Sequence, residues 1–329
     1  MNTLFVLLDG AEDHPNPELN GNKPLDVARM PFIKSNMRTL GRTTGRGYTH
    51  LFLNEFFTGH PPKLQRAVLE ALGLGMDMEG RTAYRLSPAR IGDGMIRWAY
   101  DSPNFSKELE ACVRRKIDMV KDYDPQITFF INARAVLTLK SDIVPELPGP
   151  PVDAEYVPVP GDLGRMVESI AEEMDGITDY PWGCGRFADQ YPRFECLDNL
   201  KAFSDSPTSL GVCASLGYEA EIVEDLDERF VAAREALDDG NVFLHLDEVD
   251  EYSHMKDWRR KLEILEYMDK KMKENFSDCD RIIYFIDHGT SSITGEHLPI
   301  EVPFWTTYDT DIKWNEFVPL NTLVPRLLR

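Results

Sequence analysis

Strand-like apolar runs alternate along the chain with segments of helical spacing. Three of these runs, residues 4–8, 242–246 and 282–286, are almost wholly apolar, which is typical of strands buried on both faces of a parallel sheet. Between the last two runs, apolar side chains recur at helical intervals from Trp258 to Met272, which predicts a surface helix with one apolar face. This alternation predicts an α/β fold with a doubly wound sheet.

The alternation is interrupted in the middle of the chain. There the sequence changes to short β-rich pieces such as residues 128–131 and to a proline-rich run at 145–160. We therefore expect residues 1–76 and 199–329 to form one core domain. Residues 77–198 should form a smaller α+β domain inserted over the strand ends.

Weaker signals predict further elements of the core domain. Residues 31–40 have helical spacing, and glycines within 41–47 mark a turn. The apolar run 210–214 is expected to be a strand as the alternation resumes, and residues 227–238 are expected to form an acidic amphipathic helix.

Composition predicts a globular protein without a disulfide framework. The chain has 329 residues, of which 42% are hydrophobic, and its five cysteines lack CxxC spacing, which also argues against a thiolate zinc site. A formal net charge of -20 disfavours nucleic acid and anionic membranes as partners, because both are bound mainly through Lys and Arg. No apolar run approaches the roughly 20 residues of a bilayer span, and the first run ends without a basic leader, so a cytoplasmic location is expected.

Six residues that commonly bind divalent metals follow these apolar runs. They are Asp9, Asp250, His254, Asp287, His288 and His297. Because ligands of open α/β sheets bind at the carboxyl ends of the strands, these segments should deliver their carboxylates and imidazoles to one place. Three Asp and three His side chains can hold one or two divalent ions, and this ligand set admits Mn, Zn, Fe or Co.

Several short motifs follow one another in order over most of the chain. They are Leu8-Asp9-Gly10, Pro24-Leu25-Asp26-Val27-Ala28, Leu69-Glu70-Ala71-Leu72-Gly73-Leu74-Gly75, Asp250-Glu251-Tyr252-Ser253-His254, Asp287-His288-Gly289-Thr290, and His297 with Val302-Pro303. In this order they resemble the motifs of the archaeal-type cofactor-independent phosphoglycerate mutases of the alkaline phosphatase superfamily. The resemblance implies an alkaline-phosphatase-like core and an inserted cap domain that contributes to substrate binding.

The resemblance also implies a division of the six residues between two metals. Asp250, His254 and His297 would hold one ion, while Asp9, Asp287 and His288 would hold the second, with a serine nucleophile bridging toward it. In such sites two ions stabilise the charge of the transferring phosphoryl group and of its attacking and leaving oxygens.

One motif departs from the family pattern. The family's nucleophile lies in Gly-Ser-Asp-x-Ala-His-Leu, and the corresponding stretch from Gly45 to Leu51 has Arg46 in place of the serine. Arg46 therefore occupies the catalytic nucleophile position without being nucleophilic, because a guanidinium has no lone pair with which to attack phosphorus. The nearby hydroxyls of Thr43, Thr44 and Thr49 are not in register.

A fixed positive charge at Arg46 would repel a divalent ion by several kcal/mol at a separation of about 4 Å. We therefore expect its guanidinium to pair with Asp9 or Asp287. The protein should then hold one ion rather than two.

Candidate contacts for an anionic substrate are arginines of the inserted segment. The family's Asp-Arg-Arg-Ala-Gly-Arg and Arg-Gly-Ala-Gly motifs are altered here. The arginines that remain as candidates are Arg81, Arg85, Arg97, Arg134 and Arg186. The expected ligand is a small phosphorylated or anionic metabolite.

Two classes of function follow. The first is a metal-dependent phosphoryl-transfer enzyme, either a diverged phosphoglycerate mutase or a phosphohydrolase that uses no covalent intermediate. The second is a catalytically inactive pseudoenzyme that acts as a ligand-binding or scaffold protein. Retention of all six ligand-type residues favours the first class. Loss of the serine and of the family's arginine pairs favours the second, and the oligomeric state is left open.

Overall fold

The computed structural model describes residues 2–147 and 149–329. Pro148, which belongs to the predicted proline-rich run, lies outside the described residues. Among those that are described, no helix has the length and apolar composition needed to cross a membrane.

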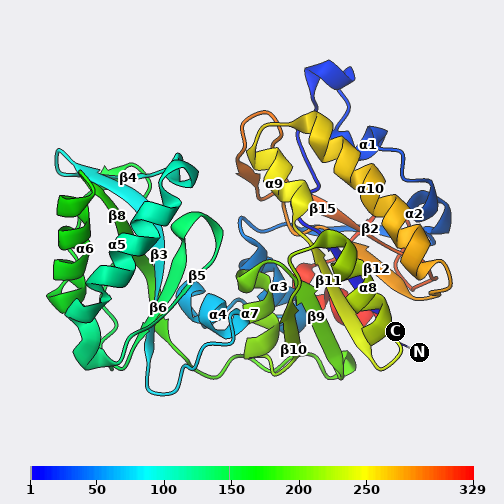
Figure 1. Cartoon of the computed structure of the whole chain (residues 1–329). Helices are drawn as coiled ribbons and strands as arrows, with labels where there is room; N and C mark the ends of the chain where they lie inside the picture. The colour runs from blue at the N-terminus through cyan, green and yellow to red at the C-terminus, as the bar shows by residue number, and fades with distance from the viewer. Residues whose placement is uncertain (1, 148) are drawn as a thin grey trace. The chain divides into compact units, whose positions relative to one another are not determined.

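The chain divides into two compact units (Figure 1). The larger unit comprises Met1–Pro62 and Gln190–Arg329, and the smaller one Lys63–Asp189. These bounds differ from the predicted ones at 76/77 and 198/199. Helix α4 (Arg66–Gly73) packs on strands of the smaller unit, which therefore begins before this helix.

The larger unit is built on an eight-stranded sheet. In spatial order its strands are β10 (Glu219–Ile222), β9 (Leu200–Ser204), β11 (Asn241–Leu246), β1 (Leu4–Leu8), β12 (Ile282–Phe285), β15 (Glu301–Thr306), β2 (Thr39–Thr44) and β16 (Glu316–Phe317). The first five strands are parallel to one another, and β15 is antiparallel to both β12 and β2. Strand β2 therefore runs in the same direction as β1. A separate antiparallel ribbon pairs β13 (Gly289–Thr290) with β14 (His297–Leu298).

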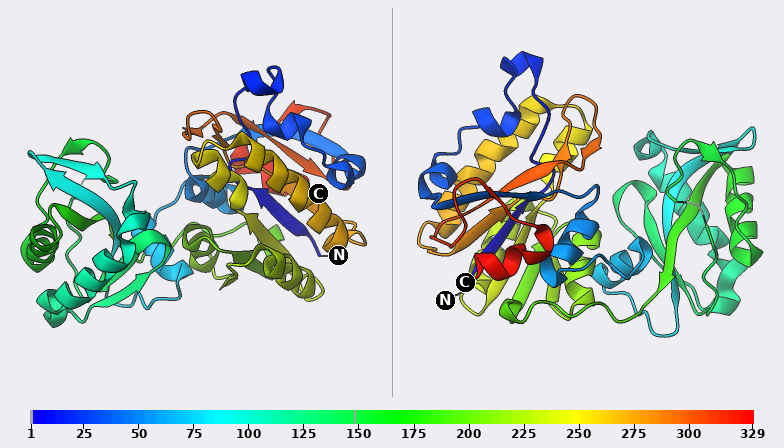
Figure 2. Two further views of the ribbon diagram at one scale, coloured as in Figure 1. Left: turned by 45° about the horizontal axis from the view of Figure 1, so that its top comes forward. Right: turned by 180° about the vertical axis from the view of Figure 1, so that it is seen from behind.

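Helices cover both faces of this sheet (Figure 2). One layer contains α1 (Pro24–Val27), α2 (Pro31–Asn36), α8 (Leu226–Ala236) and α10 (Trp258–Phe276), with α9 (Glu248–His254) packed against α10. The other layer contains α3 (Thr49–Thr58), α7 (Pro207–Ser215) and α11 (Leu320–Leu327). Short 3-10 turns occupy Pro17–Leu19 and Glu195–Leu197.

Strand β1 lies in the middle of the sheet because its side chains can be buried on both faces. All five of its residues are apolar and fully buried, and its neighbours β11 and β12 are both parallel to it. Aromatic rings extend this core under α3, where Phe56 stacks on Phe285 with ring centroids 4.3 Å apart. The three central strands therefore form a rigid base for the residues that follow them.

Two predicted elements of the larger unit have a different structure. Residues 210–214, expected to be a strand, lie within α7, which begins with Pro207 at its first helical position. Residues 41–44, expected to lie in a turn, belong to β2, where they pair with β15. A short apolar run is compatible with a strand or a buried helix, and a glycine-containing segment with a turn or a strand. Contacts with neighbouring segments decide between these alternatives.

The smaller unit is an antiparallel sheet with helices. Its strands are β5 (Gln126–Phe129), β6 (Ala135–Leu139), β3 (Thr82–Gly92), β4 (Met95–Trp98) and β7 (Ala154–Glu155) in spatial order, with β8 (Ile177–Arg186) also paired to β3. Helices α5 (Ser106–Lys116) and α6 (Gly161–Glu173) pack together against β8, and their apolar side chains join those of β3 and β6 in one core. Short 3-10 turns occupy Ser102–Asn104, Ile117–Tyr123 and Ile131–Ala133.

A buried ion pair joins α4 to β3 in this unit. Glu70 is 1% exposed and Arg85 2%. Oε1 of Glu70 forms an ion pair with Nη1 of Arg85 and accepts a hydrogen bond from Nε of Arg66 at 2.9 Å. Burial alone would raise the pKa of Glu70, but the charges of Arg85 and Arg66 outweigh burial and lower it to about 2. The Glu70 carboxylate is therefore charged in the folded protein at neutral pH.

Replacing Glu70 by Gln should destabilise the smaller unit by about 3 kcal/mol, because Arg85 would keep its charge in a buried position without a counterion. The measurement is hydrogen exchange of β3 and β8 in the intact chain. Since folding lowers the pKa of Glu70, its contribution is complete above the ordinary value near 4.5 and is lost as the pH falls from there toward about 2. Glu110→Gln, at an exposed pair with Arg114, is the matched control and should change exchange little. Equal exchange in both variants would contradict the prediction.

Candidate metal centre

The six ligand-type side chains meet at one edge of the larger sheet. Strands β11, β1 and β12 are adjacent and parallel, so their carboxyl ends lie together. Asp9 follows β1, Asp250 and His254 lie on α9 after β11, Asp287 and His288 follow β12, and His297 comes from β14. The structure thus brings all six residues together, in two groups of three.

Asp9, Asp287 and His288 form the first group, which we call the buried triad. Each carboxylate has one oxygen held by the protein and one without a hydrogen-bond partner. Oδ1 of Asp287 accepts from the amide of Gly10 at 3.3 Å. Oδ2 of Asp9 is contacted by the hydroxyl of Thr49 and by Nε2 of His245. The two unpartnered oxygens, Oδ1 of Asp9 and Oδ2 of Asp287, each lie 3.2 Å from Nε2 of His288.

The hydrogen-bond pattern around His288 leaves a lone pair on its Nε2. Its Nδ1 lies 3.1 Å from the carbonyl oxygen of Gly289 and 3.1 Å from the hydroxyl of Thr290. That hydroxyl donates to Asp250, so Nδ1 of His288 supplies the hydrogen in both contacts. The buried triad therefore brings together three atoms with free electron pairs, an arrangement that a cation stabilises.

Asp250, His254 and His297 form the second group, which we call the exposed triad because His254 lies at the surface. Nδ1 of His254 faces the carbonyl of Gly295 at 2.7 Å, and Nδ1 of His297 faces that of Gly47 at 2.8 Å. The two Nε2 atoms are 3.0 Å apart, and Oδ2 of Asp250 lies 3.1 Å from the first and 3.7 Å from the second. Both Nδ1 hydrogens point at carbonyls, so in the neutral rings each Nε2 carries a lone pair. Two lone pairs at this distance repel, so a proton or a metal ion has to lie between the two Nε2 atoms.

Negative charge is concentrated in the buried triad when no cation is bound. Burial and the charge of Asp9 raise the pKa of Asp287 to about 7. Burial would lower the pKa of His288, yet Asp287 and Asp9 raise it to about 10. Burial also acts to raise the pKa of Asp9, but hydrogen bonds from His245 and His288 hold it below its ordinary value. A divalent ion would compensate this charge, and the oxygen and nitrogen ligands suit Mn, Zn, Fe or Co.

Thr290 and Gly10 determine how closely the two triads approach. The Thr290 hydroxyl donates to Oδ1 of Asp250 and accepts from His288, so it connects a ligand of one triad to a ligand of the other. Gly10 has a φ of +59°, and a Cβ there would lie 2.4 Å from Oδ1 of Asp250 and 2.6 Å from the Thr290 hydroxyl. Only glycine fits both this backbone conformation and this space.

Thr49 brings a hydroxyl to the buried triad. It is the first residue of α3, and its Oγ1 lies 3.2 Å from Oδ2 of Asp9 and 3.5 Å from Nε2 of His288. The preceding loop is fixed by backbone hydrogen bonds, from Gly45 to Ile300 at 2.9 Å and from Arg46 to Asp287 at 2.8 Å. Motif register did not single out Thr49. Its position could have done so, because a helix that starts at the carboxyl edge of the sheet presents free amides to an anion.

Arg46 is turned away from the ligands. Its Nε donates to Oε2 of Glu55 on α3 at 2.8 Å, and its Nη2 forms an ion pair with the same oxygen. The expectation that Arg46 pairs with Asp9 or Asp287 is therefore wrong. Glu55 is the nearer partner because the amide of Arg46 is bonded to the carbonyl of Asp287, which directs the side chain toward the helix. The electrostatic reason for expecting one ion rather than two is removed.

Two buried residues outside the triads, His245 and Lys261, contact a metal-ligand side chain or the loops that carry such side chains. Nε2 of His245, a histidine within β11, lies 2.6 Å from Oδ2 of Asp9. The ammonium of Lys261 on α10 is fully buried and donates to Oδ2 of Asp13 at 3.1 Å. It also donates to the carbonyls of Gly10, Glu12 and Thr290 at 3.0, 3.2 and 2.8 Å. Lys261 thus joins the loop after β1 to the loop after β12.

The five predicted substrate-binding arginines all lie in the smaller unit, in two kinds of environment. Arg81 and Arg85 are buried; Arg81 donates to the carbonyl and carboxylate of Asp124, and Arg85 pairs with Glu70. Arg97 and Arg186 are at least partly exposed and pair with exposed carboxylates, and the guanidinium of Arg134 lies 5.7 Å from the centre of the Trp98 ring. Arg97 and Arg186 can therefore meet an anion without breaking a buried ion pair.

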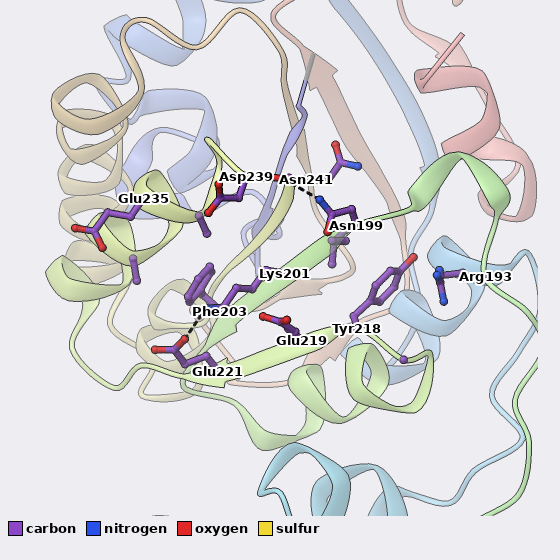
Figure 3. A pocket seen from close by; sticks show the side chains of 15 residues that line it. Arg193, Asn199, Lys201, Phe203, Tyr218, Glu219, Glu221, Glu235, Asp239 and Asn241 are labelled. Carbon is purple, nitrogen blue, oxygen red and sulfur yellow. Dashed lines mark hydrogen bonds and ion pairs between the residues drawn. The ribbon is translucent and has the colours of Figure 1, made fainter.

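A pocket of about 760 Å³ in the larger unit lies away from the triads (Figure 3). It is lined by residues at the amino ends of β9 and β11, including Asn199 and Asn241, whereas the triads follow the carboxyl ends. Glu219, Glu221 and Lys201 also line it, and the last two form an ion pair at 3.0 Å. We assign this pocket no part in the chemistry of the metal centre.

Comparison with known proteins agrees with this geometry. Residues 207–322 match the model of the Metalloenzyme superfamily. The 2,3-bisphosphoglycerate-independent phosphoglycerate mutase of Methanothrix thermoacetophila is 25% identical to this chain, over 92% of the chain and 90% of that protein. The corresponding protein of Thermococcus kodakarensis is 26% identical over 91% of the chain and 84% of that protein. The chain therefore carries a Metalloenzyme superfamily domain and is homologous to the archaeal-type cofactor-independent phosphoglycerate mutases, as its motifs predict.

Solved structures share the fold. The PH0037 protein from Pyrococcus horikoshii superposes with a TM-score of 0.75 at 18% identity, over 100% of this chain and 98% of that one. The cofactor-independent phosphoglycerate mutase from Thermoplasma acidophilum superposes with a TM-score of 0.57 at 17% identity, over 100% and 99%. The predicted class, an alkaline-phosphatase-like α/β fold, is confirmed.

Proposed function

We propose that this homologue of the phosphoglycerate mutases is a metal-dependent phosphoryl-transfer enzyme in which Thr49 is the nucleophile. The observation that carries the proposal is the convergence of unpartnered ligand atoms beside a hydroxyl. Oδ1 of Asp9, Oδ2 of Asp287 and Nε2 of His288 face one another, and Oγ1 of Thr49 lies at their side. A metal-activated nucleophile requires such an arrangement.

The two triads would each hold one divalent ion. In both, every ligand is anchored through one atom and offers another atom inward, and Arg46 is engaged by Glu55. Bound ions would supply positive charge to the phosphoryl oxygens and lower the pKa of a neighbouring hydroxyl. We therefore propose two ions in place of the single ion expected from the sequence, with Mn, Zn, Fe and Co as candidates.

The first half-reaction would transfer a phosphoryl group to Thr49. The Thr49 hydroxyl donates to Oδ2 of Asp9 at 3.2 Å, so Asp9 can take its proton as Oγ1 forms a bond to phosphorus and the ester P–O bond breaks. The leaving oxygen departs as an alcohol after taking up the proton that Asp9 accepted, relayed through solvent. The N-terminus of the ten-residue helix α3 would favour the dianionic group that forms on its first residue.

The second half-reaction would pass the phosphoryl group from Thr49 to another hydroxyl in a mutase, or to water in a hydrolase. By analogy with the relatives' names, the substrate class is a small phosphorylated acid such as phosphoglycerate. Arg97 and Arg186, which pair with exposed carboxylates, are the proposed contacts for an anion that binds to the smaller unit.

The alternative of an inactive scaffold rested on loss of the nucleophile and of the family's arginine pairs. Thr49 offers the hydroxyl that Arg46 cannot provide, so the active enzyme is the better-supported reading. Our proposal thereby replaces the sequence-based expectation of a route without a covalent intermediate.

The test combines metal analysis with assays of the purified full chain. Two transition-metal ions per chain, together with interconversion of 2- and 3-phosphoglycerate or hydrolysis of a phosphate ester, are the expected results. A protein that takes up no divalent ion from a Mn, Zn, Fe and Co panel, and turns over no phospho-substrate in any of them, would be the scaffold.

Replacing His254 by Ala should remove one of the two ions and leave the other. His254 belongs only to the exposed triad, while the buried triad keeps all three of its ligands. The measurement is the metal content after dialysis, with His14→Ala as a control at an exposed histidine outside both triads. A chain that still holds two ions after loss of His254 would rule out this assignment.

A further inference from the structure

His245 is a buried imidazole that contacts a ligand of the buried triad from behind. It lies at the end of β11, opposite Leu7 of β1, and is 0% exposed. Its Nε2 is 2.6 Å from Oδ2 of Asp9, and its Nδ1 is 2.7 Å from the hydroxyl oxygen of Ser204, the last residue of β9. A strand on each side thus fixes one ring nitrogen.

The neighbours of Ser204 determine which nitrogen of His245 carries the hydrogen. The amide of Ser206 donates to Oγ of Ser204 at 2.8 Å, so the Ser204 hydroxyl is left to donate its own hydrogen to Nδ1 of His245. Nε2 then carries the hydrogen and donates to Asp9. This is the opposite of the three ligand histidines, whose Nδ1 atoms point at backbone groups and whose Nε2 atoms point at the triads.

That tautomer excludes His245 as a ligand. Asp9, His245 and Asp247 are close enough to suggest a third ion site. A nitrogen that bears a hydrogen has no lone pair for a metal, and Nδ1 is taken by Ser204. The role of His245 has to be exerted through Asp9.

We propose that His245 is a positioning residue that decides which oxygen of Asp9 faces the cation. Its hydrogen bond and that of Thr49 both go to Oδ2, which leaves Oδ1 unpartnered and 3.2 Å from Nε2 of His288. Rotation of the carboxylate would break both hydrogen bonds. His245 therefore orients a metal ligand and the acceptor of the Thr49 proton at the same time.

This inference rests on the proposed metal-dependent function and predicts an effect on one ion. His245→Phe keeps a ring beside Phe243 but has no hydrogen-bond donor. It should therefore lower the affinity of the buried triad for its ion by about 10- to 100-fold and leave the affinity of the exposed triad unchanged. His245→Gln keeps a side-chain N–H that can reach Asp9 and should restore most of the affinity. The measurement is titration of the metal-free full chain with Mn and with Zn by calorimetry.

Two serines give a matched pair of controls. Ser204→Ala removes the hydroxyl that donates to Nδ1 of His245. It should lower the affinity for the same ion by a smaller factor than His245→Phe does. Ser209 is equally buried, has no hydrogen-bond partner and lies on α7, so Ser209→Ala should leave both affinities unchanged. If His245→Phe binds both ions as tightly as the unmodified chain, the positioning role is refuted while the metal-dependent function stands.

Nitrogen-15 NMR of the metal-free, unmodified chain provides a test that needs no variant to fold. At a pH where the ring is neutral, we expect the Nε2–H tautomer at His245. An Nδ1–H tautomer at His245 would overturn the inference. If the unmodified chain binds no ion, the proposed function itself fails.

Discussion

Replacing Thr49 by Val should abolish phosphoryl transfer, with a loss of turnover of about 10³-fold or more. Val has nearly the shape of Thr but no hydroxyl, so it removes the proposed nucleophile and leaves the packing of the first turn of α3. Thr49 is not among the six ligand-type residues, and the variant should still take up two ions. The measurement is the rate of phosphoglycerate interconversion or phosphate-ester hydrolysis at saturating metal.

Two further observations separate a nucleophile from a residue that only binds. Thr49→Ser should retain activity because it keeps the hydroxyl. Acid quenching during turnover, followed by mass spectrometry, should find a phosphoryl group on Thr49 in the unmodified chain. Activity of Thr49→Val within tenfold of the unmodified protein would exclude the covalent route and favour direct attack by water.

Replacing Lys261 by Met should destabilise the larger unit by about 3–5 kcal/mol, because Asp13 would be left as a buried charge without its counterion. Three backbone carbonyls, those of Gly10, Glu12 and Thr290, would also lose their donor. The loops after β1 and β12 are joined through this ammonium, so metal affinity should fall as well. The measurements are urea unfolding of the metal-free chain and metal titration of the folded variant.

The same helix offers a matched control for Lys261. Lys270 is 66% exposed and pairs weakly with Glu274 at 3.6 Å, so Lys270→Met should change stability by less than about 0.5 kcal/mol. Adding Asp13→Asn to Lys261→Met should recover part of the loss, since the uncompensated charge is removed while an oxygen remains for the amide of Ser292. An unfolding midpoint of Lys261→Met equal to that of Lys270→Met would show that the buried ammonium is not needed.

The sequence predicts the strands that are buried on both faces and fails where neighbours decide the structure. The runs at 4–8, 242–246 and 282–286 match the observed β1, β11 and β12 to within one residue at each end, because nearly continuous apolar composition over five residues leaves little choice in a sheet covered on both sides. The run 210–214 is as apolar but lies in α7, and the glycine-containing residues 41–44 form β2. Both depend on contacts with distant segments that periodicity does not contain.

The residues of the candidate site also differ in how far the sequence could predict them. The ligand-type residues could be found because each follows a strand whose position the pattern predicts. Thr49 and His245 were not assigned their contacts, because both meet Asp9 from segments far away in sequence. Arg46 shows the converse: its chemistry was clear, but the direction of its side chain is determined by the hydrogen bond of its own amide to Asp287 and by Glu55 on the next helix.

Gly10 has a consequence for how such chains diverge. It carries no functional group, yet a single methyl group there would collide with Asp250 and Thr290, in a backbone conformation that side chains rarely adopt. A lineage could therefore lose its metal centre by drift at a position that never touches an ion, with every ligand intact. A survey that sorts relatives into active and inactive by the six ligand residues alone would count such a chain as an active enzyme. Substitution of the glycine that follows Asp9 would reveal the loss.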